Sequence, residues 1–392
     1  MRIVQFANFY TPTSGGLRTC VEETGRGYTA LGHTRVLVVP GTADSDEWTP
    51  AGRRVTFASP SLGSGGYRVI TARRRLVRLL DEVLPDVLEI SDKLGVPWLS
   101  TWARRQRVPT VVFSHERLDA ILRARIPGPF PLAASADAIN RGLRKRVDTV
   151  VVASEFAAAE FARARILDVQ RVPLGVDLET FHPRAGLSRS STVDDFVELV
   201  MLSRLSTEKS PELAVHTLRQ LIATGTRARL TIIGAGPLRP RIERLVAGLP
   251  VTFLGHICDR AAVAQLVASA DVALAPSSAE TFGLATLEAL ACGTPVVVPT
   301  EGALRELVRD QAAGVVRQPT PAAFADGVRM LLALPERVRR AAARSVAEQF
   351  PWSLTVHRLL ALHTSLSDAY DRLSPERTSS RRSAAGASAS RR

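Results

Sequence analysis

The chain has 392 residues, of which 45% are hydrophobic and 5% aromatic, and its formal net charge is +13 at pH 7. Because single hydrophobic cores stop growing near 250–300 residues, this length predicts two domains. No run of about 18 uncharged apolar residues occurs, so no membrane-spanning helix is expected. The basic charge suits nucleic acid, anionic lipid or anionic substrates alike. The low aromatic content, without an RNA-binding or helix-turn-helix pattern, argues against nucleic acid.

The chain start and the cysteines bear on the compartment. Residues 1–6 read as a buried strand and lack the long apolar core and the cleavage site of a signal peptide. Cys20, Cys258 and Cys292 have neither metal-ligand nor disulfide-framework spacing. This usage suits a reducing compartment, so we expect a soluble, cytoplasmic protein.

The first half alternates short apolar runs with helical patterns, which is typical of βα units around a parallel sheet. It predicts strands at 3–6, 35–39, 87–90, 110–113 and 149–153, with 172–174 closing the domain. We place the first domain at residues 1–183. Asp44-Ser45-Asp46 lies in a polar stretch flanked by Gly, Thr and Pro, and we interpret it as a solvated loop rather than a metal site.

The second half restarts the same pattern, with strands predicted at 197–202, 228–233, 251–254, 272–275 and 295–298. We place the second domain at residues 196–350, after a polar linker. A helix over 351–373 is expected to cross back to the first domain. The tail at 374–392 carries five Arg and one Glu among Ser and Ala residues, so we expect it to be disordered.

Two loops of the first half are candidate ligand sites. Residues 10–16 follow the first strand, and Gly15 and Gly16 would let main-chain amides face a phosphate, although a plain glycine turn fits as well. His115 directly follows the fourth strand. A lone histidine is more often structural than functional.

The loop after the first strand of the second domain holds Arg204 and Lys209. In α/β folds ligands bind at strand ends. An arginine fork and a mobile lysine together suit a diphosphate leaving group, whereas isolated solvated charges would mean nothing. Gly236 belongs to a Gly-x-Gly-Pro turn after the next strand, which by itself is a weak signal.

The most informative segment spans residues 276–296. Glu280 precedes a predicted helix, Glu288 lies within it, and seven residues separate them. Gly283 permits close approach of a ligand to the backbone, and amides at the helix start can receive a phosphate. The alternative is an amphipathic helix with two exposed glutamates.

This segment resembles the E-x7-E signature of the large retaining glycosyltransferase family 4 with the GT-B fold, and the embedded Phe282-Gly283-Leu284 also fits. The resemblance implies two Rossmann-like α/β domains facing each other across a cleft. It further implies that Glu280 grips hydroxyls of the donor sugar and that Glu288 binds the nucleotide ribose. Arg204 and Lys209 would hold the diphosphate.

The same resemblance assigns the remaining donor residues. It places Gly15 and Gly16 at the phosphate, and Gly236 beside the nucleotide. Ile257 and Asp259 would lie at the base, where Asp259 is a candidate for reading guanine and a surface turn is the alternative. His115 would project toward the transferred sugar.

Further segments resemble the actinobacterial mannosyltransferases that build phosphatidylinositol mannosides; they are residues 4–10, 14–19, 65–68, 114–119 and 173–177. This implies a GDP-mannose donor, a glycolipid acceptor contacted by Tyr10, Arg68 and His115, and no metal or other cofactor. We expect a monomer. The alternatives are another nucleotide sugar with a soluble acceptor, or a non-catalytic sugar-nucleotide-binding protein.

Four arginines crowd one predicted helix: Arg73, Arg74, Arg75 and Arg78. The apolar residues of that helix are expected to face the core, so the arginines would meet either an anionic bilayer or bulk water. The first interpretation predicts a peripheral protein on the inner face of the plasma membrane.

Overall fold

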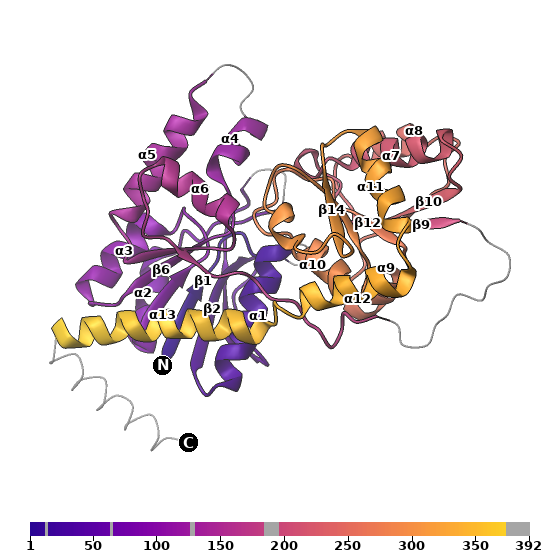
Figure 1. Ribbon diagram of the computed structural model, residues 1–392. Coiled ribbons are helices and arrows are strands. Elements are labelled where there is room, and N and C mark those ends of the chain that lie inside the picture. The colour runs from indigo at the N-terminus through magenta and orange to yellow at the C-terminus, as the bar shows by residue number, and fades with distance from the viewer. Residues whose placement is uncertain (12–14, 63–65, 126–129, 184–195, 374–392) are drawn as a thin grey trace.

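The protein consists of two α/β domains, which confirms the predicted fold class (Figure 1). The computed structural model describes residues 1–11, 15–62, 66–125, 130–183 and 196–373. The predicted linker and the basic tail therefore lie outside the described residues. Among those that are described, no helix is long and apolar enough to span a bilayer.

The N-terminal domain is built on one eight-stranded sheet with the order β3-β4-β2-β1-β5-β6-β7-β8. Only β3 runs antiparallel, pairing with β4. Most inner strands are rich in Val, Leu and Ile and largely buried on both faces, as expected for a parallel sheet covered by helices. The strands are β1 (Arg2–Phe6), β2 (Thr34–Gly41), β3 (Ser45–Thr49), β4 (Gly52–Ala58), β5 (Val87–Ile90), β6 (Thr110–Ser114), β7 (Thr149–Val152) and β8 (Gln170–Arg171).

The structure corrects two sequence-based assignments in this domain and adds β4, an inner strand that the sequence analysis did not predict. Residues 172–174 are not a strand, because the edge pairing to β7 involves Gln170 and Arg171 instead. The stretch after Asp44 is not a loop but the edge strand β3, which is exposed along most of its length and therefore shows no apolar pattern. Asp46 pairs with Arg53 across the hairpin at 2.7 Å, and Asp44 pairs with Arg75 of α2 (Arg73–Val83) at 3.1 Å. Both carboxylates are therefore engaged by arginines.

Five further helices cover the N-terminal sheet. They are α1 (Gly16–Ala30), α3 (Val96–Arg105), α4 (Leu118–Arg125), α5 (Leu132–Arg144) and α6 (Glu155–Arg163). In α6 the Ser154 hydroxyl accepts a bond from the amide of Ala157, which fixes where that helix begins.

The C-terminal domain holds a six-stranded parallel sheet with the order β11-β10-β9-β12-β13-β14. The sequence analysis missed β14, a short edge strand. The strands are β9 (Val197–Leu202), β10 (Ala228–Ile233), β11 (Val251–Gly255), β12 (Val272–Leu274), β13 (Val296–Pro299) and β14 (Gly314–Arg317). The helices are η1 (Thr207–Lys209), α7 (Pro211–Ala223), α8 (Arg239–Leu245), α9 (Arg260–Ala268), α10 (Leu284–Ala291), η2 (Leu304–Leu307), α11 (Pro321–Leu332) and α12 (Glu336–Ala347).

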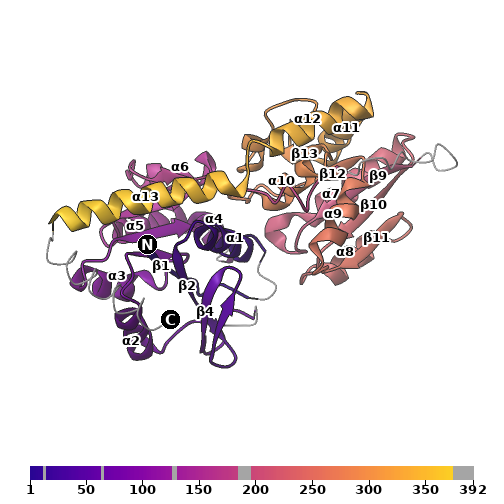
Figure 2. The same cartoon turned by 90° about the horizontal axis from the view of Figure 1, so that it is seen from below.

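The last helix, α13 (Trp352–Leu373), leaves the C-terminal domain and runs along the N-terminal one (Figures 1 and 2). It packs on α1, where Val356 fills the space left by Gly27. Thr355 donates to the carbonyl of Pro173 at 2.8 Å, and Tyr370 donates to Asp148 at 2.5 Å. These contacts join the end of the chain to the first domain.

A buried polar cluster lies where α1 and α13 meet the N-terminal sheet. Glu89 accepts hydrogen bonds from Gln5 at 2.8 Å and from Tyr28 at 3.0 Å, and His363 Nε2 lies 3.5 Å from the oxygen that Tyr28 contacts. Arg35 donates to Gln5. Burial raises the pKa of Glu89 and lowers that of His363 to about 3.

Candidate active site

Two helix starts face each other between the domains. A methyl group placed on Gly16, at the start of α1, would lie 3.6 Å from Leu284 Cδ1 at the start of α10. Neither helix has a side-chain cap on its first amides among the described residues. The N-terminal amides and the positive dipole ends of two helices make this junction suited to an anionic group.

The α10 start requires glycine at position 283. Gly283 has φ +97°, and a Cβ there would lie 2.1 Å from Leu304 Cδ2. Phe282 beside it is buried and packs edge-on against Phe350. Packing against Leu304 and Phe350 thus fixes the turn that presents the helix amides.

Lys209 and Glu280 form the central ion pair of the site. Lys209 Nζ lies 2.5 Å from Glu280 Oε1, and the two side chains are 18% and 25% exposed. The pair is held because Ser277 donates to the carbonyl of Glu208 at 2.7 Å, which ties the η1 loop to the loop after β12. The Lys209 ammonium and the Glu280 carboxylate therefore meet at the edge of the sheet where the parallel strands end.

Arg204 lies at the interdomain cleft and is about half exposed. Its guanidinium donates to Tyr67 of the N-terminal domain at 3.3 Å and to Glu208 at 3.2 Å. Tyr67 in turn packs edge-on against Phe9. Tyr67 was not among the predicted site residues, although it directly precedes Arg68, which was.

Three loops at this edge are joined backbone to backbone. Leu205 donates to the carbonyl of Ala235 at 3.1 Å and accepts from the amide of Leu238 at 2.9 Å. A Cβ at Gly236 would lie 2.3 Å from the Leu205 carbonyl oxygen, so this glycine is needed to position the Arg204 loop. Ile257, in the third loop, is half-buried against the core.

Asp259 is exposed, and its carboxylate caps α9 by accepting from the amide of Ala261 at 2.9 Å. The carboxylate is thus already used locally, which weakens the case for a base-reading role.

Glu288 lies one to two turns into α10, with 15% of its side chain exposed and Arg260 at 3.5 Å. Burial raises the pKa of this carboxyl to about 7, and Arg260 opposes the rise only in part. A buried carboxyl whose pKa lies near 7 and whose one cationic neighbour is 3.5 Å away is suited to binding a polar ligand.

His115 lies on the N-terminal side of the junction. Its ring stacks on Phe113 with 4.4 Å between ring centres, and burial lowers its pKa to about 4. Nε2 is buried and has no hydrogen-bond partner among the described residues. The ring is therefore a neutral imidazole at physiological pH with one free polar atom. Its backbone carbonyl accepts a bond from Thr281 at 2.7 Å, directly beside Glu280.

The two remaining acceptor candidates are engaged within the N-terminal domain. Tyr10 donates to Glu22 at 2.5 Å and accepts from Arg54, while Arg68 donates to the carbonyl of Ser59 at 2.5 Å. Gly15 and Gly16 are exposed at the start of α1. The structure thus brings Gly16, Arg204, Lys209, Glu280 and His115 to the interdomain junction.

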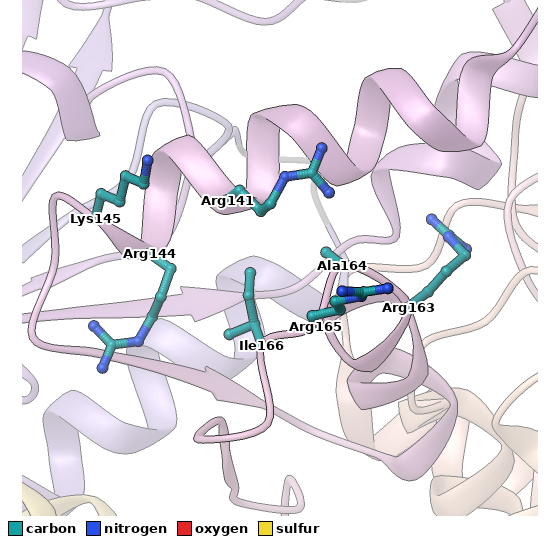
Figure 3. Close-up of a pocket in the computed structure, with 7 residues that line it drawn as sticks. All are labelled: Arg141, Arg144, Lys145, Arg163, Ala164, Arg165 and Ile166. Carbon is teal, nitrogen blue, oxygen red and sulfur yellow. The ribbon is translucent and has the colours of Figure 1, made fainter.

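A separate cavity of about 340 Å³ lies between the ends of α5 and α6 (Figure 3). None of the candidate site residues lines it. Its basic side chains stand where the two helices end, and cations there stabilise the negative ends of helix dipoles. They are Arg141, Arg144, Lys145, Arg163 and Arg165.

Nothing in the described part of the chain gathers three or more His, Cys, Asp or Glu side chains into a group able to hold a metal ion.

Two family models match the chain. The model described as Glycosyltransferase Family 4 matches residues 14–180, and the model described as Glycosyl transferases group 1 matches residues 197–333. Together they cover most of both domains. The chain belongs to this glycosyltransferase family, and its two facing α/β domains are the GT-B fold.

Curated relatives are consistent with this placement. The chain is 43% identical over 366 residues to the GDP-mannose-dependent alpha-(1-6)-phosphatidylinositol dimannoside mannosyltransferase of Mycobacterium tuberculosis strain H37Ra, covering 92% of this chain and 95% of the relative. It is 34% identical over 262 residues to the D-inositol 3-phosphate glycosyltransferase of Geodermatophilus obscurus, covering 63% and 56%.

Solved structures share the fold at low identity. A sucrose-phosphate synthase from Thermosynechococcus elongatus superposes with a TM-score of 0.76 at 23% identity, covering 94% of this chain and 99% of that one. A glycosyltransferase involved in lipopolysaccharide biosynthesis superposes with a TM-score of 0.67 at 17% identity, covering 95% and 99%.

Proposed function

We propose that this protein transfers mannose from GDP-mannose, with retention of the α configuration, to a phosphatidylinositol mannoside. The observation that carries the choice of substrates is the 43% identity, over nearly the full length of both chains, to a relative named for that donor and acceptor. The geometry supports the reaction class, because cationic side chains and two helix starts converge where a diphosphate would leave.

In the proposed reaction the diphosphate departs between the facing starts of α1 and α10. Arg204, Lys209 and the amides after Gly283 stabilise the negative charge that develops on it. Glu280, already 2.5 Å from Lys209, orients the hexose hydroxyls. Glu288 accepts from the ribose. The acceptor hydroxyl attacks from the face that the diphosphate leaves and gives its proton to an oxygen of the departing diphosphate. Closure of the domains excludes water, which would otherwise hydrolyse the donor.

His115 contributes as a neutral ring. Because burial holds its pKa near 4, it carries no charge at pH 7, and its unpartnered Nε2 is available for a sugar hydroxyl. We assign it to orientation of the transferred sugar on the acceptor side. Tyr10 and Arg68 are assigned to the acceptor, and release of their present bonds to Glu22 and Ser59 would accompany its binding.

We propose that the reaction needs no metal ion, because Arg204 and Lys209 supply the positive charge that a cation would otherwise provide. We also propose that the protein acts as a monomer on the cytoplasmic side of the membrane. Its three cysteines are free thiols, as a reducing compartment requires.

The proposed membrane contact is the outer surface of α2. Arg73, Arg74, Arg75 and Arg78 are all exposed there. Arg73 covers the Trp98 ring at 6.0 Å beside a groove of about 570 Å³, whose rim includes Leu94, half exposed. Exposed cations beside apolar side chains suit an anionic lipid surface.

The donor is tested by incubating the protein with a panel of nucleotide sugars and membrane lipid extract, followed by mass analysis of the products. We expect one hexose to be added to a phosphatidylinositol mannoside from GDP-mannose alone. Calorimetry should show binding of GDP and not of UDP. Clear binding of UDP alone would overturn the guanine assignment and the mannose proposal with it.

The membrane contact is tested by replacing Arg73, Arg74, Arg75 and Arg78 with Gln. Each basic residue near an anionic surface contributes on the order of 1 kcal/mol, so binding to phosphatidylinositol vesicles should fall steeply while GDP affinity stays unchanged. The matched control deletes residues 374–392. If that deletion alone abolishes vesicle binding, α2 is a solvated face. If the unaltered protein does not bind anionic vesicles, a soluble acceptor becomes the better hypothesis.

A further inference from the structure

One carboxylate crosses between the domains and caps a helix that it does not belong to. Glu306 lies in η2 of the C-terminal domain. Its Oε2 accepts from the amide of Glu155 at 2.9 Å, and its Oε1 accepts from the amide of Phe156 at 2.8 Å. These are the first two residues of α6 in the N-terminal domain. First-turn amides have no acceptor within their own helix, and a negative charge there is favoured by the helix dipole.

On the N-terminal side, the capped turn holds the loop that carries His115. Arg117 of that loop stacks on the Phe156 ring at 4.2 Å and donates to the Phe156 carbonyl at 3.1 Å. Asp119 fixes the same guanidinium at 2.7 Å. Movement of the α6 start would therefore move the His115 loop with it.

On the C-terminal side, η2 is bound to the loop that carries Glu280. The amide of Ala303 donates to the Glu280 carbonyl at 3.1 Å, and Leu304 occupies the space left open by Gly283. Glu306 follows two residues later. The carboxylate that reaches across the cleft is thus rigidly connected to the donor side of the site.

A second, shorter link runs in parallel. Thr281 donates to the His115 carbonyl at 2.7 Å, and its own carbonyl accepts from the Ser154 hydroxyl at 2.6 Å. Ser154 is also the residue that caps Ala157 in α6. The bond to Ser154 reaches the same helix start as Glu306, whereas the bond to the His115 carbonyl joins the two loops directly.

We propose that Glu306 is a positioning residue, which sets the separation between the Glu280 loop and the His115 loop by capping α6 across the domain interface. This inference rests on the proposed function, because it assigns these loops to the donor and to the acceptor side. Glu306 does not touch the sugar or the diphosphate. It acts through the placement of the two loops that do.

The experiment compares Glu306→Ala with Glu301→Ala. Glu301 is an exposed carboxylate just before η2, so its removal changes the charge equally without affecting a helix start. Hydrogen exchange at the amides of Glu155 and Phe156 is measured by mass spectrometry on the full chain. We expect exchange at least about tenfold faster in Glu306→Ala, because these amides have no other acceptor in α6. The control should match the unaltered protein.

Kinetics then separate positioning from general support of the fold. In Glu306→Ala, kcat should fall about tenfold while the dissociation constant for GDP stays within about twofold, because Arg204, Lys209 and Glu288, the side chains assigned to GDP, all lie in the C-terminal domain. Glu306→Gln, which keeps one acceptor oxygen and loses the charge, should be intermediate. If Glu306→Ala lowered the GDP affinity and the melting temperature along with kcat, the role of Glu306 would be structural and the proposal would be overturned.

Unchanged exchange at Glu155 and Phe156 in Glu306→Ala would also overturn it, as would altered exchange with an unchanged kcat. A failure of the proposed function has a different signature. In that case the unaltered protein itself would not turn over GDP-mannose, while the exchange measurement would still decide whether Glu306 caps α6.

Discussion

Replacing Glu288 with Gln should stabilise the fold while it weakens nucleotide binding. Burial raises the pKa of this carboxyl from 4.5 to about 7. At about 1.36 kcal/mol per pH unit, the ionised form is disfavoured in the folded protein by roughly 3 kcal/mol. Gln has nearly the same shape and no charge to desolvate, so it removes this cost and keeps the packing.

The sign of the pH dependence follows from proton counting. Between pH 4.5 and about 7 the folded protein keeps a proton on Glu288 that the unfolded chain releases. The free energy of unfolding of the unaltered protein therefore falls as the pH rises through this window and is level above it. The advantage of Glu288→Gln should be about 3 kcal/mol at pH 8 and below about 1 kcal/mol at pH 5.

Scanning calorimetry at the two pH values measures this difference. Each kcal/mol moves the melting temperature of a domain of this size by about 2–4 °C, so the variant should melt roughly 6 °C or more above the unaltered protein at pH 8. The exposed Glu301→Gln serves as the control. GDP should bind the Glu288 variant about tenfold more weakly, because a charged acceptor becomes neutral. If the variant and the unaltered protein melted at the same temperature at both pH values, Glu288 would be ionised in the folded protein at no cost, and the reasoning would be refuted.

Four other outcomes are expected. Lys209→Ala should lower kcat by about 100-fold or more, measured as GDP release, with little change in melting temperature; an unchanged rate would remove Lys209 from the leaving-group role. Excess EDTA should leave the transfer rate unaltered, whereas loss of activity that manganese restores would contradict the metal-free proposal. Gly283→Ala should cost several kcal/mol in urea unfolding, since its Cβ would lie 2.1 Å from Leu304 at a positive φ. His363→Gln should resist acid better than the unaltered protein. Burial lowers the His363 pKa to about 3, so as the pH falls below about 6.5 the unfolded chain binds a proton that the folded protein does not, and this destabilises the unaltered protein. Circular dichroism melts at pH 7 and pH 4 measure this, and an equal loss of melting temperature on acidification in both proteins would contradict it.

Local sequence determined the architecture of this protein. Apolar runs such as those of β7 and β13 can be buried only between helices on both faces of a parallel sheet, so the βα pattern was readable without coordinates. The signature around Glu280 and Glu288 could also be identified from the sequence, because all of it lies within one contiguous strand-loop-helix unit. The short or charged edge strands β3 and β14 were not predicted, because an edge strand needs little apolar sequence. The inner strand β4 was also missed, because Arg53, Arg54 and Thr56 interrupt its apolar residues.

The tertiary structure decided which of these side chains meet. Glu89 lies in a predicted strand, and only the return of α13 places His363 against it. Glu306 gave no signal in the sequence, because its meaning depends on a helix start about 150 residues earlier along the chain. Contacts of this kind depend on how two domains are set against each other, and no local pattern of residues encodes that arrangement.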